Sequence, residues 1–564
     1  MWWHLQNLGY VTLLEPKEEE HHLTDILPTP ENFDNVNLIV GMQFLINLVN
    51  RFCCPSCRRI GKMNSRVTQR RGLLYNITFT CECSYETSIC NSSPLNNPAS
   101  SRMDELNMQV YIAANVGGIK RYGMTQILGC LNILPPVQRA NWNKYQSIYA
   151  KSIKTVADKS LEAAAIEAAD QAEEPFDHQG VTNVTVSIDG SWLTRRGHSS
   201  LHGVATCCST ADPPKVLDYE VLSRHCSTCA GLLGIKDMDQ QSYEQLLQEH
   251  LISGCDANHA GSSAGMEAAG VVSIFCRSEN KHLLRYTTFI ADGDAANERA
   301  LLDAEPYGPD IKIRRLQCIG HFSKRMRTAL QTLKKSYKGE KLSDGLSIGG
   351  RKGRLTDEKI NQLTRYYGSA IRSHVHDLQS MKAACWSTYY HYKSTRSNPQ
   401  HDFCDPSKCY LYRQKTFDVA KHSLPEAVMD ALLPVYQKMC SEEMLQKVVD
   451  GGSTNTNESF HNQIWSLCPK TQFHPAQYIK TSVALAACFY NEGYLWTITN
   501  LLTICGIDRP NPACSQVFHL VDIQRQKEEK KKPNIRQQQR QVRLRQDISL
   551  NSQEKYPYAS GGFD

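Results

Sequence analysis

The chain has 564 residues, more than one compact domain normally holds, so we expect about two or three folded units. Its net charge of +6 is mild, so the placement of the basic residues matters more than their sum. No stretch reaches the ~18 continuous apolar residues of a membrane span, and residues 38–49 fit a short, buried amphipathic helix. A signal peptide is not expected either, so the 22 cysteines are interpreted as thiols or metal ligands rather than disulfides.

Two close pairs of cysteines flank a basic, β-rich segment near the start of the chain: Cys54 and Cys57, then Cys81 and Cys83. Such pairs supply the thiolates of a zinc ribbon, in which Zn²⁺ replaces a hydrophobic core. Cys53 could substitute for Cys54, Cys90 is a further candidate, and free thiols in a small β unit are the alternative. Basic residues between the pairs could contact DNA phosphates: Arg58, Arg59, Lys62, Arg66, Arg70 and Arg71. We expect an N-terminal helix and zinc-ribbon-like domain over residues 1–91.

After a linker rich in Asn, Ser and Pro, residues 102–180 are predicted to form a helical region. From residue 181 onward, apolar β-type runs alternate with helical patterns. The expected strands are 184–189, 202–208, 216–222, 286–291 and 311–316, and the expected helices among them are 265–276 and 295–304. A three-stranded hairpin followed by helix, strand, helix, strand and helix is the order of an RNase H-like fold, so we predict an α/β chain with this mixed sheet.

Three acidic residues stand where such a fold brings side chains together. Asp189 and Asp292 end apolar strand-like runs, and Glu458 lies in the first turn of a predicted helix, after Asn and Thr residues that suit its cap. Three carboxylates at one sheet edge can hold two divalent metals, an arrangement that serves phosphoryl transfer. Asp294 is the alternative for the second acid, although its position before Ala295 also suits a helix cap.

Seven stretches of the chain, in order, resemble the Mutator-like transposase domain, a DDE-type member of the RNase H-like superfamily. They are Ser187–Trp192, Arg196–Gly203, Val216–Ser223, Asn258–Glu267, Arg285–Asp294, Cys318–His321 and Asn457–Asn462. The segment Tyr111–Pro136 also resembles the family's amino-terminal region, so the similarity extends over most of the chain. No single stretch is specific, but their order and spacing together are.

The resemblance implies cut-and-paste DNA transposition with Mg²⁺ or Mn²⁺, and it maps the catalytic triad onto Asp189, Asp292 and Glu458. It implies an RNase H-like core in two parts, residues 181–321 and 453–508, separated by a helical insertion over 322–452. Double-stranded DNA, as transposon ends and target, would be the partner, and the oligomeric state stays open. Two alternatives remain: a domesticated DNA-binding or regulatory protein without catalysis, and a metal-dependent nuclease.

Other cysteines and histidines form less specific groups. Cys226, Cys229, Cys255 and His259 could bind a second zinc ion, or they could be a buried thiol pair with a hydrogen-bonded histidine. Cys318 and His321 match the family's Cys-X-X-His signature, and with two ligands visible they are interpreted as structural or close to DNA. A further group, His401, Cys404 and Cys409, lies in a loop that contains Pro and Asp.

The expected insertion has helical periodicity over 356–392 and 424–449, and Trp386 among its tyrosines is interpreted as core, with base stacking as the alternative. A predicted helix over 318–338 is rich in Lys and Arg and could bind a polyanion, or it could be a solvated face. Residues 509–564 form a basic tail, expected to be disordered or a single exposed helix. That tail could act as a nuclear import signal or a phosphate-binding arm, so we expect the protein in the nucleus.

Overall fold

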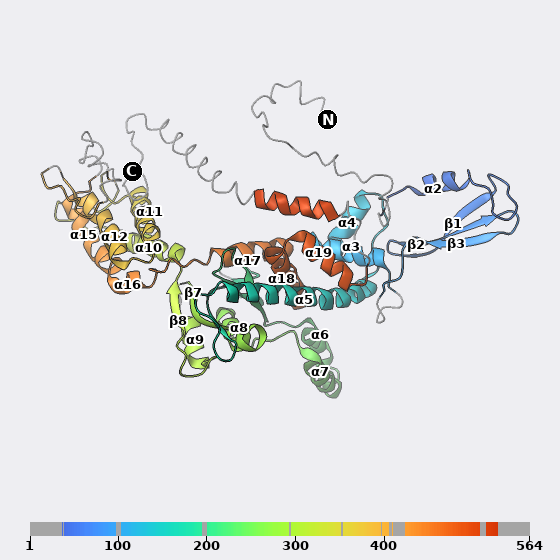
Figure 1. Ribbon diagram of the computed structural model, residues 1–564, viewed down its shortest axis with the longest axis horizontal. Helices are drawn as coiled ribbons and strands as arrows, with labels where there is room; N and C mark the ends of the chain where they lie inside the picture. Colours follow the sequence, from blue (N-terminus) through green and yellow to red (C-terminus); the bar gives the residue numbers. More distant parts are fainter. Residues whose placement is uncertain are drawn as a thin grey trace, which may run out of the picture. The chain divides into compact units, whose positions relative to one another are not determined.

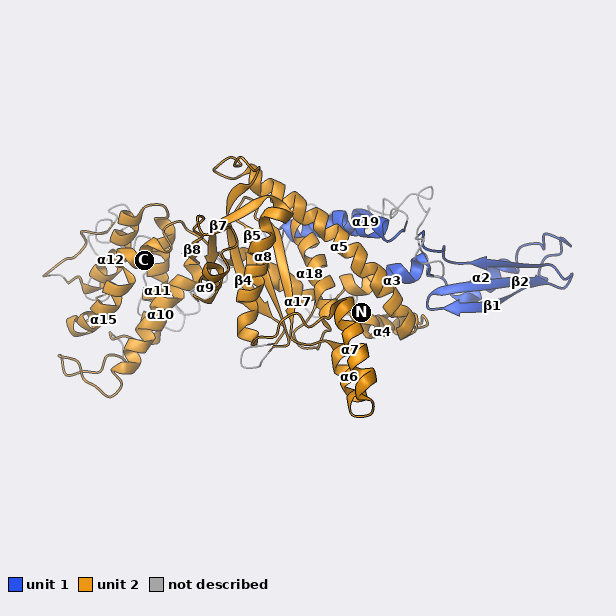
Figure 2. Ribbon diagram, turned by 90° about the horizontal axis from the view of Figure 1, so that it is seen from below, with its two compact units in different colours: residues 1–109, 493–534 blue, residues 110–492, 535–564 orange. Residues whose placement is uncertain are grey.

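The chain divides into two compact units in the computed structural model, which describes residues 37, 39–96, 103–194, 200–292, 295–350, 353–395, 397–404, 409, 423–507 and 515–527. Unit 1 consists of Met1–Gln109 and Gly493–Asn534, and unit 2 consists of Val110–Glu492 and Ile535–Asp564 (Figure 2). Among the described residues, no helix is both long enough and apolar enough to cross a membrane.

The centre of unit 2 is a mixed five-stranded sheet in the order β6-β5-β4-β7-β8. Its strands are β4 (Thr182–Trp192), β5 (His202–Ser209), β6 (Val216–Ser223), β7 (Leu284–Ala291) and β8 (Arg314–Gln317). β4, β5 and β6 pair in antiparallel fashion, whereas β7 pairs in parallel with both β4 and β8. All five strands occur where the sequence predicts them, except that β8 begins three residues later than expected. The sheet and its helices make this a mixed α/β chain.

Helices cover both faces of this sheet because successive strand residues point to opposite sides. The apolar positions of β4 and β7, including Val186, Ile188 and Phe289, pack with Phe275 of α8 (Met266–His282) in a buried core. Ser187 lies on the opposite face and contacts α17 (Asn455–Leu467). α5 (Arg139–Asp170) and α9 (Ala296–Ala304) also contribute to this core, and α18 (Ala476–Asn491) packs against α5, α17 and β6 (Figure 1).

A group of helices, called the insertion below, separates β8 from α17. It contains α10 (Ile319–Ser336), α11 (Asp357–Ser373), α12 (Leu378–Lys393), α15 (Glu426–Met439) and α16 (Glu442–Gln446). The periodic span 356–392 is two helices, because Asp377 accepts a hydrogen bond from the backbone of Ser380 and begins α12. Trp386 packs against Tyr389 and Tyr436 in the core of the insertion, which supports the core interpretation for this residue.

Further helices of the chain precede and interrupt the sheet. They are α3 (Glu105–Val116), α4 (Lys120–Cys130), α6 (Ser227–Lys236), α7 (Gln240–Gly254) and the short 3₁₀ helix η5 (Ser263–Gly265). The sequence analysis did not foresee α6 and α7, which pack against each other between β6 and α8. This helical pair changes which residues surround the cysteines of that segment.

Unit 1 contains a three-stranded antiparallel sheet in the order β1-β2-β3, together with helices. Its elements are α2 (Met42–Val49), β1 (Met63–Arg71), β2 (Leu74–Cys81), β3 (Glu86–Cys90) and α19 (Tyr494–Ile504). The expectation that α2 is buried is wrong, because none of its residues is buried. Residues 515–527 of the tail are helical, and Asp522 accepts hydrogen bonds from the first backbone amides of α19. The rest of the tail lies outside the described residues.

Candidate active site and metal clusters

Asp189 lies within β4 rather than at its end, at a point where β4 still pairs with β5 but no longer pairs with β7. The parallel pairing of β4 with β7 ends at Ser187 and Ile290, whereas the antiparallel pairing with β5 continues to Trp192. The Asp189 side chain therefore lies beyond the last residue pair with β7, on the same face as Ser187. One of its carboxylate oxygens accepts a hydrogen bond from the backbone of Gly190 at 3.0 Å.

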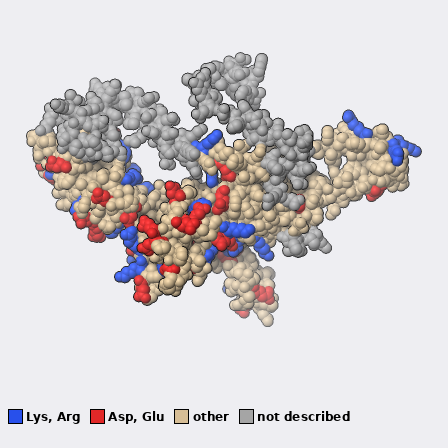
Figure 3. Space-filling view, in the orientation of Figure 1, with Lys and Arg blue, Asp and Glu red and all other residues tan. Residues whose placement is uncertain are grey.

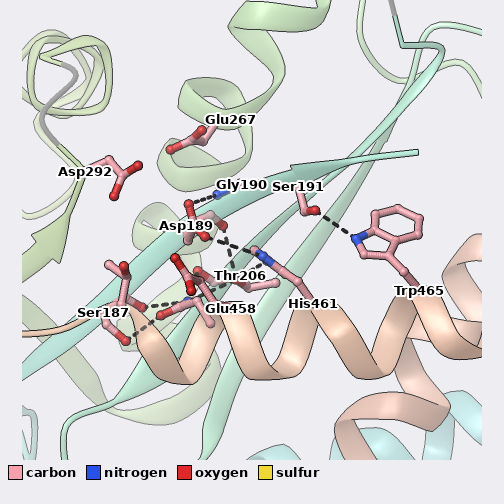
Figure 4. Close-up of polar contacts among 12 residues, drawn as sticks. Ser187, Asp189, Gly190, Ser191, Thr206, Glu267, Asp292, Glu458, His461 and Trp465 are labelled. Atoms are coloured by element: carbon pink, nitrogen blue, oxygen red, sulfur yellow. Dashed lines mark hydrogen bonds and ion pairs between the residues drawn. The ribbon is translucent and has the colours of Figure 1, made fainter. Parts of the chain in front are cut away.

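Asp292 and Glu458 reach the same region from two other elements. Asp292 directly follows β7, and Glu458 lies in the first turn of α17. His321, in the first turn of α10, connects them: its Nδ1 is 2.5 Å from Asp292 Oδ1, and its Nε2 is 3.9 Å from Glu458 Oε1. Figure 4 shows the carboxylates of Asp189, Asp292 and Glu458 around a common space. The structure thus brings together the three acids that the sequence singled out.

The electrostatics of this space favour a cation. Burial raises the pKa of Asp189 to about 8, and the carboxylates of Glu267 and Asp292 add to the effect, against the Gly190 hydrogen bond. Burial also raises the pKa of Asp292, while His321 and Lys324 oppose that shift. Crowded carboxylates show raised pKa values when no counter-charge is near, and a divalent ion would reverse the effect. Their oxygen donors are the type that Mg²⁺ and Mn²⁺ prefer.

Asn457 anchors α17 to the sheet beneath the acids. It is fully buried, accepts a hydrogen bond from Ser187 Oγ at 2.6 Å, and donates from Nδ2 to the backbone oxygens of Ser187 and Thr206. These bonds tie the helix to β4 and β5 at once. These bonds therefore also fix the position of the neighbouring Glu458 relative to the sheet.

His461 holds the Asp189 side chain from the same helix. Its Nδ1 is 3.5 Å from Asp189 Oδ2, and its Nε2 is 2.9 Å from Thr206 Oγ1. Burial lowers the pKa of His461 to about 3, so its ring is neutral near pH 7. The sequence analysis missed this residue, although its spacing of three from Glu458 places both on one helix face.

Glu267 is a fourth carboxylate that the sequence analysis did not single out. It lies in the first turn of α8, where Asn297 donates a hydrogen bond to its Oε1 at 2.7 Å. Its side chain comes so close to Gly190 that a Cβ there would be 2.6 Å from Glu267 Oε2. A side chain at position 190 would therefore displace the Glu267 side chain. No local pattern reveals this contact, because it joins elements far apart in the sequence.

Asp294, the alternative second acid, lies outside the described residues. The N-cap of α9 is Ala295, and its side chain forms no capping hydrogen bond. Asp292 is therefore the acid of this pair that can be placed at the site.

The Cys-X-X-His pair connects the candidate active site to the insertion. Cys318 is buried, its backbone N–H donates to the oxygen of Ala291, and its Sγ accepts a hydrogen bond from the backbone of Thr454 at 3.4 Å. The cysteine thus joins the end of β7 to the start of α17, and His321 lies beside Asp292, which follows β7, and Glu458, in the first turn of α17. Among the described residues, the pair belongs to none of the Cys/His groups that could hold a metal.

The N-terminal cysteines form one of those groups. Cys54 Sγ is 3.6 Å from Cys83 Sγ, and Cys57 Sγ is 3.7 Å from Cys81 Sγ. Thiolates around one tetrahedral zinc are about 3.8 Å apart, because each Zn–S bond is ~2.3 Å long. The group could therefore hold a metal such as zinc. Cys53 and Cys90 are exposed and lie outside it.

The second group contains Cys226, Cys229 and Cys255 as expected, but its histidine is His250 rather than His259. His250 Nε2 is 3.2 Å from Cys226 Sγ, and Cys229 Sγ is 3.4 Å from Cys255 Sγ. His259 instead lies with its Nε2 3.0 Å from the backbone oxygen of Ser262. The difference arises because α7 folds back on α6 and brings residue 250 beside Cys226. This group too could hold a metal such as zinc.

We expect Cys57→Ser to remove one metal ion per chain and to unfold residues 50–90 without affecting unit 2. Small metal domains depend on the ion for folding, since zinc contributes roughly 10–16 kcal/mol of apparent binding free energy to zinc-finger peptides. Metal analysis and hydrogen exchange would measure both effects. The matched control is Cys90→Ser, which changes an exposed cysteine of the same sheet. Equal metal content in the two variants would contradict the prediction.

Comparison with known proteins identifies the class of this mixed α/β chain. The family model described as Mutator-like transposase matches residues 37–410, more than half of the chain. The chain belongs to the Mutator-like transposase family, a finding that suggests a nucleic-acid-processing enzyme. A search of curated proteins found no match. The matched range includes Asp189, Asp292 and the N-terminal cysteines but ends before α17, so the assignment of Glu458 relies on the geometry and on the sequence resemblance.

Proposed function

We propose that this protein is a cut-and-paste DNA transposase that uses Asp189, Asp292 and Glu458 to cleave DNA and join its strands. The observation that carries this proposal is the convergence of three carboxylates, from β4, the end of β7 and α17, in a chain of the Mutator-like transposase family. The strand order, with the third, second, first, fourth and fifth strands of the core side by side, supports an RNase H-like fold.

The residues fit a pair of Mg²⁺ or Mn²⁺ ions. Two such ions would activate water and then a DNA 3′-hydroxyl as nucleophile, and would stabilise the leaving oxygen. Asp189 would contribute to both ion sites, while Asp292 and Glu458 would each complete one. His461 and the Gly190 amide orient the Asp189 carboxylate, and His321 orients Asp292. The protein supplies position and charge rather than a covalent intermediate.

Basic residues border the acids where a DNA backbone would lie. A cavity of about 340 Å³ is lined by His321 and Glu458 together with Lys324 of α10 and Arg365 and Arg372 of α11. On the face shown in Figure 3, basic and acidic side chains are interspersed. We therefore assign DNA binding to this cavity, called the basic groove below, rather than to the overall charge. Phosphate contacts from Lys and Arg position DNA without reading its sequence. The proposed partner is therefore double-stranded DNA, and the proposed location is the nucleus.

Full-length protein incubated with Mg²⁺ and the DNA ends that flank its gene tests this function. We expect strand cleavage and joining by the wild type and by Glu358→Gln, but a loss of about 10³-fold, or ~4 kcal/mol, in Glu458→Gln. Glu358 is a matched control because it also lies in the first turn of an exposed helix face. Binding without cleavage would favour a domesticated DNA-binding protein, and cleavage without joining would favour a nuclease.

A further inference from the structure

Four side chains that commonly bind metals come together in the helical insertion, on elements other than those that carry the three acids. They are His391, in the last turn of α12, and His401, Cys404 and Cys409, in the chain that follows it. All four are buried, with exposed fractions between 0% and 8%. Their ligand atoms lie within 4.8 Å of one another. The sequence suggested three of these residues, and the fourth, His391, is supplied by the helix.

The separations match one tetrahedral ion. Cys404 Sγ is 3.6 Å from His401 Nδ1 and 3.9 Å from His391 Nδ1, and Cys409 Sγ is 3.3 Å from His401 Nδ1. For Zn–S bonds of ~2.3 Å and Zn–N bonds of ~2.0–2.1 Å, sulfur and nitrogen ligands of one zinc ion are about 3.6 Å apart. The observed distances fall on both sides of that value. All four groups thus surround a single position.

His401 is oriented by a contact on the opposite side of its ring. Its Nε2 is 3.0 Å from the buried Ser394 Oγ, which also accepts a hydrogen bond from the backbone of Gln400 at 3.1 Å. When Nε2–H donates to the second lone pair of this hydroxyl, Nδ1 keeps its own lone pair for the cluster. Metal-binding histidines commonly donate their other ring nitrogen in this way, which fixes the ring and its tautomer.

The cluster also explains how this part of the insertion is packed. In the described parts of 394–425 there is no helix or strand, yet Cys404 and Cys409 belong to the insertion's buried core. A metal ion can hold residues that lack regular secondary structure in a buried position. Leu424 donates a backbone hydrogen bond to Tyr392, next to His391, so the segment returns to the end of α12 before α15 begins.

We propose that His391, His401, Cys404 and Cys409 form a structural zinc centre that fastens this segment to α12. Two thiolates and two imidazoles suit Zn²⁺ and not the oxygen-preferring Mg²⁺. Four protein ligands leave no open position for substrate, so the centre is structural and not catalytic. It is independent of the proposed DNA cleavage, because none of its residues contributes to the candidate active site.

Zinc content of the purified full-length protein tests the proposal. Cys404→Ser is expected to bind one ion fewer per chain than the wild type, whatever the other two clusters hold. His401→Cys keeps a four-ligand set and should retain the wild-type content. The matched control is Cys440→Ser, which alters a buried cysteine of the same core that lies outside the cluster. Equal zinc in wild type and Cys404→Ser, or loss of zinc in the control alone, would overturn the proposal.

A second measurement uses the wild type, in case Cys404→Ser does not fold. Cysteine alkylation is compared by mass spectrometry in the presence of Zn²⁺ and after treatment with a chelator. We expect Cys404 and Cys409 to become reactive when the metal is removed, whereas Cys440 stays protected by the core. If the two cysteines respond to chelation no more than Cys440 does, the centre does not exist.

Discussion

Asp189→Asn is expected to lower Mg²⁺-dependent DNA cleavage by about 10³-fold or more, while DNA affinity stays close to that of the wild type. Asparagine keeps the shape of the side chain but loses the negative charge that would neutralise two cations, and charge stabilisation by metals contributes several kcal/mol, with ~1.4 kcal/mol per tenfold change in rate. The basic groove lined by Lys324, Arg365 and Arg372 is unchanged in this variant. Cleavage of labelled DNA and fluorescence anisotropy measure the two quantities separately.

The same variant has a second expected signature that does not depend on catalysis. A ligand that binds only the folded state stabilises it by RT ln(1 + [L]/Kd), so Mg²⁺ should raise the unfolding temperature of the wild type. Asp189→Asn should lose that increase, because its site has one carboxylate fewer. Asp303→Asn is the control, since Asp303 is exposed in the last turn of α9 and is not one of the three acids. Full cleavage by Asp189→Asn, or equal Mg²⁺ stabilisation in both variants, would contradict the assignment.

The strands and the positions of the three acids could be predicted because their signals are local. Apolar β-type runs mark β4, β5, β6 and β7, and Asp189 and Asp292 stand at the polar ends of two such runs. β8 was placed too early because Ile311 and Ile313 are apolar without pairing in the sheet. Glu458 is marked by Asn and Thr residues ahead of it, and Thr454 is the N-cap of α17, but the predicted side-chain cap is absent because Thr454 forms no capping hydrogen bond. In each case the residues next to one another in the sequence determine the local secondary structure, so a short segment is enough to predict it.

The rest of the site could not be predicted because it depends on contacts between distant segments. Glu267 reaches Asp189 only because α8 packs across β4 at Gly190, and His250 replaces His259 only because α7 folds back on α6. No periodicity encodes either contact. His461 is an intermediate case: helical spacing places it on the face of Glu458, but its contact with Thr206 depends on the pairing of β4 with β5. Local patterns thus predict elements, and tertiary packing decides their side-chain partners.

The Cys-X-X-His pair shows how the large insertion can be tolerated without moving the acids. Cys318 contacts both Ala291, one residue before Asp292, and Thr454, four residues before Glu458. The chain leaves the core through α10, forms the insertion and returns at α17, so both ends of the insertion are fixed at one cysteine. Changes in the insertion would then alter the bordering basic groove while the distance between the two acids is maintained.

The identity of the second acid is decided by comparing Asp292→Ala with Asp294→Ala. We expect Asp292→Ala to be folded and inactive, because this carboxylate directly follows β7 and contacts His321 at 2.5 Å, beside Glu458. Asp294→Ala should keep measurable cleavage. Because α9 has Ala295 as its N-cap, without a side-chain capping bond, we expect the stability lost by Asp294→Ala to be at the low end of the roughly 0.5–2 kcal/mol of a lost cap.

Each variant serves as the control for the other, since both remove one carboxylate and the two positions are only two residues apart in the sequence. Thermal unfolding followed by circular dichroism establishes that both are folded, and the DNA cleavage assay then compares their rates. A loss of about 10³-fold is expected in Asp292→Ala alone, as for the other two acids of the triad. If Asp294→Ala is inactive while Asp292→Ala cleaves DNA, the second metal ligand is Asp294, and the contact between Asp292 and His321 has a structural role instead.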